Sequence, residues 1–182
     1  MLVDRNLSFS KHITQKVNKA NSIMELISRT YTFLNETSFR YLFQALVRPN
    51  LEYAAAVWSP YTKNDIESIE NVPRRATKQV PSLKQLSYRL KKLKMPTLKY
   101  RRLRGDMIET FKIVNGIYDK DVTEIFFEMN RTDQTRGHSK KIQKGNCRQN
   151  LRKDSFKNRV TDIWDDLPQE LIQCTSKNSK EL

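Results

Sequence analysis

Apolar residues recur at spacings of three and four along the first part of the chain, and this periodicity constrains the fold more than any other feature. The apolar positions are Phe9, Ile13, Val17, Ala20, Met24, Ile27, Tyr31 and Leu34. Such spacing places the residues on one face of an amphipathic helix. Either Ser8 or Ser10 could cap that helix. The chain is therefore predicted to begin with a long helix that buries one face.

Similar patterns follow, and each is bounded by a cap or a proline. Asn35 or Thr37 could cap a second helix, and we expect Pro49 to hold Arg48 outside the α region. A short helix is predicted over 50–58 and a longer one over 62–80, with a kink or a break at Pro73. Further helices are predicted over 83–93, from 97 to a stop at Gly116, over 119–129 and over 154–166.

These elements predict an all-α fold, an irregular bundle of about six to eight helices. A helical domain is expected over 9–129, a basic loop region over 130–150 and a helical C-terminal tail over 151–182. The loop region has room for one short strand or hairpin near 139–143.

The segment 74–104 carries an unusual charge. It contains 12 Lys or Arg and neither Asp nor Glu, and leucines, tyrosines and one methionine are spaced through it. Long runs of like charge are usually disordered, but these apolar residues indicate a folded surface instead. The whole chain has a formal charge of +14 and a pI near 9.9, which favours nucleic acid as the partner over an anionic membrane surface.

Several other classes of protein have no support in the sequence. No apolar run approaches the roughly 20 residues of a membrane span, and no signal peptide is recognisable, so an intracellular setting is expected. Cys147 and Cys174 form no CxxC, and only His12 and His138 could complete a metal site, which favours two free thiols. The four glycines do not form a phosphate-binding loop.

A longer pattern points to a known family. Residues 45–61 read ALVRPNLEYAAAVWSPY, and this run resembles a signature of the reverse transcriptases of non-LTR retrotransposons, the jockey-like and CR1-like group. Other landmarks similar to that family follow in order: RRATK at 74–78, RRLRGD at 101–106, NG at 115–116, TRGHS at 135–139, and RV at 159–160 followed by Trp164 and Leu167-Pro168. The resemblance spans nearly the whole chain.

The resemblance implies a place after the palm of such a polymerase. Residues 1–8 would be the end of the last palm turn, and the rest would form the thumb and the C-terminal tail. The thumb of the family grips template and primer, while palm carboxylates hold Mg²⁺. The chain would then contribute backbone binding within an RNA-directed DNA polymerase, in a nuclear or cytoplasmic ribonucleoprotein. Its partners would be an RNA/DNA duplex or a single strand, together with a palm domain that this sequence lacks.

The candidate nucleic-acid-binding residues are basic side chains and one histidine: Arg74, Arg75, Lys78, Lys91, Lys92, Arg101, Arg102, Arg104, Arg136 and His138. For His138, a structural role in a turn is favoured over a phosphate contact. Tyr88, Tyr100 and Trp58 could stack on bases, but their positions on apolar stripes favour packing in the core.

No catalytic residue and no resident cofactor are expected. The Asp165-Asp166 pair lacks the aromatic-x-Asp-Asp pattern of the family, and a solvated helix end is the simpler interpretation. The chain alone is therefore expected not to polymerise. Two alternatives remain: a free-standing basic nucleic-acid-binding protein, and a degenerate, non-functional product of a retroelement. The second is motivated by Pro73, which stands where the family more often has Gln, and by a shortened stretch around Tyr88.

Overall fold

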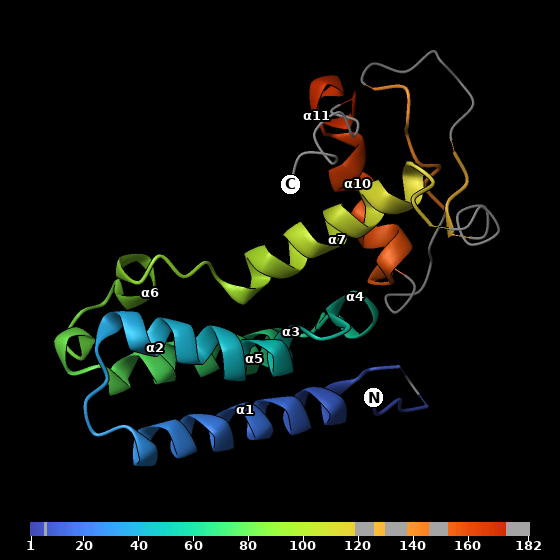
Figure 1. Cartoon of the computed structure of the whole chain (residues 1–182). Coiled ribbons are helices and arrows are strands. Elements are labelled where there is room, and N and C mark those ends of the chain that lie inside the picture. Colours follow the sequence, from blue (N-terminus) through green and yellow to red (C-terminus); the bar gives the residue numbers. More distant parts are fainter. Residues whose placement is uncertain (6, 119–125, 130–137, 146–152, 174–182) are drawn as a thin grey trace. The chain divides into compact units, whose positions relative to one another are not determined.

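The computed structural model describes residues 1–5, 7–118, 126–129, 138–145 and 153–173. Over these residues the protein is all-α, as predicted (Figure 1). The chain divides into two compact units, Met1–Leu103 and Arg104–Leu182. This division falls within the segment that was expected to form one helical domain. Most of the acidic helix predicted over 119–129 and the end of the C-terminal tail lie outside the described residues.

The first unit is organised around α1 (Ser10–Thr30), which packs against α3 and α5. Its buried apolar residues include Ile13, Ala20, Met24 and Ile27, so the predicted helix and its buried face are confirmed. Neither serine caps it. Phe9 occupies the cap position with a left-handed backbone. The hydroxyl of Ser10 instead donates to the carboxylate of Asp65 on α5 at 2.8 Å.

His12 is the one buried polar residue of α1. Its Nδ1 accepts a hydrogen bond from the backbone N–H of Leu2 at 3.2 Å, and its ring meets the indole of Trp58 edge-on at 5.5 Å. Burial lowers the pKa of His12 from its ordinary value, and the charge of Lys16 adds to this effect. The folded unit therefore holds this imidazole neutral more strongly than the unfolded chain does.

The stability of the first unit should consequently fall as the pH is lowered from about 6.5, the ordinary histidine pKa. As the pH falls, His12 of the unfolded chain takes up a proton before the buried imidazole of the folded chain does. The stability that comes from the neutral imidazole is therefore fully present above this pH and is lost as the pH falls further. Urea denaturation at pH 7.5 and 5.5 measures the loss, which should be smaller in His12→Gln. An equal loss in that variant would contradict the assignment.

The second helix begins as the sequence predicts but continues differently. Asn35 caps α2 (Glu36–Leu42), and its side chain accepts from the N–H of Ser38 at 2.7 Å. A π-helical segment (Phe43–Val47) then leads directly into α3 (Arg48–Glu52). The expectation for Arg48 is wrong, since its φ of −56° and ψ of −44° are α-helical. The wider π turn, closed by the N–H of Arg48 on the carbonyl of Phe43, lets the chain pass through Pro49 without leaving the helix.

The predicted helix over 50–58 is split in two. The left-handed backbone of Ala54, with φ of 55°, separates α3 from α4 (Ala55–Trp58). Next, Thr62 caps α5 (Lys63–Ala76) through a hydrogen bond from the N–H of Asp65 at 3.2 Å. The structure shows no break at Pro73: α5 continues past it to Ala76, although the proline cannot donate a hydrogen bond to the carbonyl of Ile69.

After α5 the first unit contains only short elements before its last helix. These are 3₁₀ turns at Thr77–Gln79 and Pro81–Leu83 and one turn of α6 (Arg89–Lys92). The last helix of the unit is the start of α7 (Leu98–Val114). One continuous core joins α1 to these turns. Its largest fully buried side chains are Ile13, Phe39, Phe43, Leu51, Trp58, Ile69 and Leu83.

The second unit contains the rest of α7, α10 (Phe156–Asp165) and α11 (Gln169–Gln173). Gly116, with φ of 64°, ends α7 as predicted, and the N–H of Ile117 reaches back to the carbonyl of Lys112 at 3.0 Å. The short strand that the loop region allowed is a single antiparallel bridge between Met129 and Ile142. The core of this unit consists mainly of Ile113, Phe127, Ile142, Val160, Trp164 and Ile172.

Candidate nucleic-acid interface

Between α5 and α7 the basic segment 74–104 forms only short elements, two 3₁₀ turns and the single turn of α6, rather than one long helix. The helix predicted over 83–93 forms only over Arg89–Lys92. The reason lies in the side chain of Arg89, whose Nη1 donates to the backbone carbonyls of Lys84 and Leu86. Those carbonyls are thereby used in a turn instead of a helix. The left-handed backbone of Lys94, with φ of 52°, then ends α6.

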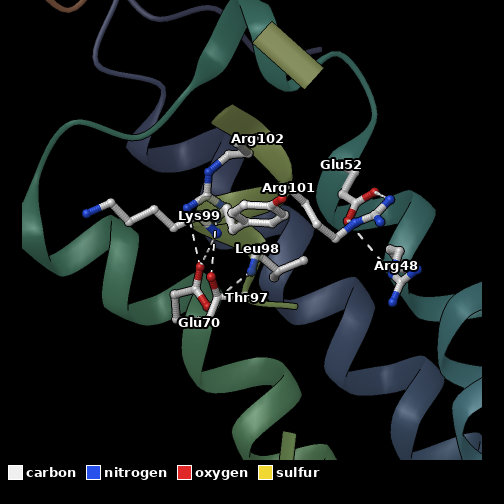
Figure 2. Close-up of polar contacts among 9 residues, drawn as sticks. Arg48, Glu52, Glu70, Thr97, Leu98, Lys99, Arg101 and Arg102 are labelled. Atoms are coloured by element: carbon white, nitrogen blue, oxygen red, sulfur yellow. Dashed lines mark hydrogen bonds and ion pairs between the residues drawn. The ribbon is translucent and has the colours of Figure 1, made fainter. Parts of the chain in front are cut away.

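Arg102 was predicted to bind nucleic acid, but it is buried in the first unit. Its Nη2 lies 3.5 Å from a carboxylate oxygen of Glu70 on α5, and both side chains are less than a tenth exposed. The same carboxylate accepts from the backbone N–H groups of Leu98 and Lys99, the first residues of α7 (Figure 2). Glu70 therefore caps α7 and neutralises a buried guanidinium at once.

Arg101 is also engaged within the first unit. Its Nη2 donates to Glu52 at 2.8 Å, its Nε makes a second hydrogen bond to the same carboxylate, and Arg48 approaches this carboxylate at 3.8 Å. Figure 2 shows the side chains of Arg101 and Arg48 beside Glu52. The hydrogen bonds to Glu52 raise the pKa of Arg101, whereas burial lowers the pKa of Arg48. Arg101 and Arg102 thus fix the start of α7, within the first unit, to α3 and α5.

The other predicted binding residues differ in their environments. Arg74, Arg75, Lys78 and Lys91 are exposed, and none has an ion pair within the part of the chain that the structure describes. Lys92 is exposed but lies 3.0 Å from a carboxylate oxygen of Glu36, and this contact lowers the pKa of Glu36.

The remaining predicted residues do not belong to the first unit. Arg104 is exposed and is the first residue of the second unit. Arg136 lies outside the described residues. His138 is buried, with its Nδ1 accepting from the N–H of Lys140 at 3.2 Å, so its Nε2 carries the proton and donates to the carbonyl of Trp164 at 3.0 Å. Both ring nitrogens are occupied, which supports the structural role.

Trp164 completes this arrangement in the second unit. Its indole N–H donates to the carbonyl of Lys140 at 2.8 Å, and its ring meets His138 edge-on at 5.9 Å. The neighbouring Asp165 accepts from the N–H of Ile142 at 3.0 Å. These contacts attach residues 138–142 to α10, and they give Asp165 a structural role.

A hollow in the first unit brings together residues that the sequence did not group. Its volume is about 530 Å³, and it is lined by Arg74, Thr77, Ser87, Tyr88, Arg89, Leu90, Lys91, Met95, Pro96 and Thr97. Tyr88 is 56% exposed and Tyr100 is 59% exposed, so the expectation that both pack in the core is wrong, whereas Trp58 is buried. The run Ser-Tyr-Arg-Leu-Lys at 87–91, which places a serine and a tyrosine next to two cations, is the one signal that could have indicated the hollow.

Comparison of the chain with models of protein families, with characterised proteins and with solved structures gives no match. Within the described ranges, no group of three or more His, Cys, Asp or Glu side chains is placed to hold a metal ion. No described helix is long and apolar enough to cross a membrane.

Proposed function

We propose that the first unit binds the phosphate backbone of nucleic acid, as the thumb of a non-LTR reverse transcriptase does, and that the chain is the segment after the palm of such an enzyme. The observation that carries the proposal is the uneven pairing of charge. Three of the basic residues in 74–103 have a carboxylate partner, namely Lys92, Arg101 and Arg102. The others are without an ion pair among the described residues: Arg74, Arg75, Lys78, Lys84, Arg89, Lys91, Lys94 and Lys99.

The Lys and Arg side chains that lack a carboxylate partner lie on one short segment, where the phosphates of a polyanion would neutralise their charge. Contacts of this kind position a nucleic acid without reading its sequence. The resemblance of residues 45–61 to the retrotransposon signature supports the choice of a primer and template duplex as the partner. The alternative is a free-standing basic nucleic-acid-binding protein with no polymerase attached. It would bind nucleic acid through the same basic residues.

Salt dependence tests the backbone contact. The logarithm of the binding constant for an RNA/DNA duplex should fall linearly with the logarithm of salt concentration, by about 0.9 for each phosphate neutralised. Replacing Arg74, Arg75 and Lys78 together by Ala should reduce this slope by roughly two to three. The measurement is an equilibrium titration of the duplex at several salt concentrations.

A matched control removes the same charge from elsewhere in the unit. Lys11, Lys19 and Arg29 are exposed residues of α1, and their triple replacement by Ala should leave the slope nearly unchanged. An unaltered slope in the Arg74, Arg75 and Lys78 variant would falsify the proposed contact. Equal changes in both variants would indicate binding through net charge alone.

A further inference from the structure

The hollow beside α6 has the chemistry of a site for one unpaired nucleotide. Its walls come from the last turn of α5, from residues 87–91 and from residues 95–97 just before α7. A volume of about 530 Å³ falls within the range of small-molecule sites, which is roughly 300–1,000 Å³. The lining residues contain three cations, Arg74, Arg89 and Lys91, and no carboxylate.

Arg89 is held in position before any ligand arrives. Its Nε donates to the hydroxyl of Thr77 at 3.2 Å, and its Nη1 donates to two backbone carbonyls. These bonds fix the plane of the guanidinium, so little side-chain entropy is lost when an anion binds it. Arg74 and Lys91 are exposed at the same hollow, so a phosphate there would meet one fixed cation and two exposed ones.

Tyr88 supplies a flat surface beside these cations. It is 56% exposed, although Leu86 and Leu90, two residues away on either side, pack against the core. Leu90 and Met95 add apolar surface to the same hollow, and Ser87 and Thr97 add hydroxyl groups. An exposed aromatic ring next to phosphate-binding cations is the arrangement with which proteins hold single strands, through stacking on the ring and charge on the backbone.

We propose that this hollow binds one nucleotide of a single-stranded nucleic acid, with its base stacked on Tyr88 and its phosphate held by Arg89, Arg74 and Lys91. The inference rests on the proposed backbone binding and adds to it a preference for an unpaired segment. In a duplex the base is already stacked and paired, so it cannot lie on Tyr88 without leaving its partner.

Two oligonucleotides separate stacking from charge. The probes are a ten-residue oligodeoxythymidylate and a strand of the same length made of abasic units, which has the phosphates but no bases. The full chain should bind the first about tenfold more tightly than the second, since stacking of one base on an aromatic side chain is of this order. Tyr88→Ala should remove the difference, and Tyr88→Phe should retain it.

The control variant is Tyr100→Ala, because Tyr100 is equally exposed in the same unit and does not line the hollow. It should bind both strands as the natural chain does. Equal binding of the two strands by the natural chain, or an undiminished difference in Tyr88→Ala, would overturn the nucleotide site.

These outcomes leave the proposed function to be judged separately, by the salt dependence of duplex binding in the Arg74, Arg75 and Lys78 variant. Inorganic phosphate serves as a third probe. If it competes with both strands equally and the base adds nothing, the hollow is a phosphate site only and the stacking role of Tyr88 is rejected.

Discussion

Glu70→Gln is expected to lower the free energy of unfolding by about 3–5 kcal/mol, the range found when one partner of a buried ion pair is removed. The substitution leaves the guanidinium of Arg102 buried beside a neutral amide, because its side chain is only 6% exposed. It also weakens the acceptor that the N–H groups of Leu98 and Lys99 share at the start of α7. Urea denaturation followed by circular dichroism at 222 nm measures the loss.

Two further variants show whether the buried charge is the cause. Glu67→Gln removes an exposed carboxylate from the same helix and should change stability by no more than about 0.5 kcal/mol. Combining Glu70→Gln with Arg102→Met should restore much of the loss, since a well-packed apolar residue avoids the uncompensated charge. Equal losses in Glu70→Gln and Glu67→Gln would show that the ion pair does not hold α7.

Trp164→Ala is expected to cost about 3–5 kcal/mol of stability in the second unit, as truncation of a large buried aromatic residue usually does. Trp164 is 1% exposed, and its indole N–H is the donor to the carbonyl of Lys140. The substitution therefore opens a cavity and leaves that carbonyl without its donor. Denaturation of the full chain, again followed at 222 nm, should show a transition at lower urea concentration.

The next residue back along α10 provides the comparison. Ile163 is 39% exposed, and Ile163→Ala should cost less than about 1.5 kcal/mol because a large part of this side chain stays in contact with water in the folded chain. Trp164→Phe should fall between the two, since it keeps an aromatic ring in the core but loses the hydrogen bond. If the alanine variants at 163 and 164 were equally stable, the described contacts of α10 would not support the second unit.

Local sequence signals were sufficient for the features that depend on neighbouring residues. The spacing of Ile13, Ala20 and Met24 predicted α1, and the cap at Asn35 and the stop at Gly116 also follow from local chemistry. Each of these interactions joins residues a few positions apart, so a single stretch of sequence contains both partners.

The buried face of α7 could not be predicted in the same way. Tyr100 was expected on the apolar stripe that packs in the core, whereas the buried positions of this helix include Arg102, Asp106 and Thr110. Asp106 is paired with Arg159 at 2.9 Å, a residue 53 positions away in the chain. Charged residues are normally assigned to the solvent face, and only the tertiary partner shows that they are buried in pairs.

Burial of charged residues in pairs also separates the cations of the candidate interface into buried and exposed ones. The count of 12 cations in 74–104 predicted a basic surface, but charge alone does not distinguish Arg102, which is buried against Glu70, from Arg74, which is exposed. The hollow was missed for a related reason. Arg74 lies in α5 and Thr97 lies just before α7, and no periodicity within a single helix indicates that they line the same hollow.

The two tryptophans of the chain give each unit its own optical reporter. Trp58 in the first unit lies edge-on to His12, and Trp164 in the second lies edge-on to His138, with both indoles almost fully buried. A buried indole emits at shorter wavelength than one in water, and a protonated imidazole beside it quenches the emission. Single-tryptophan variants made with Trp58→Phe or Trp164→Phe would therefore report the unfolding of each unit separately, and the emission of Trp58 would also report the protonation of His12, without any added label.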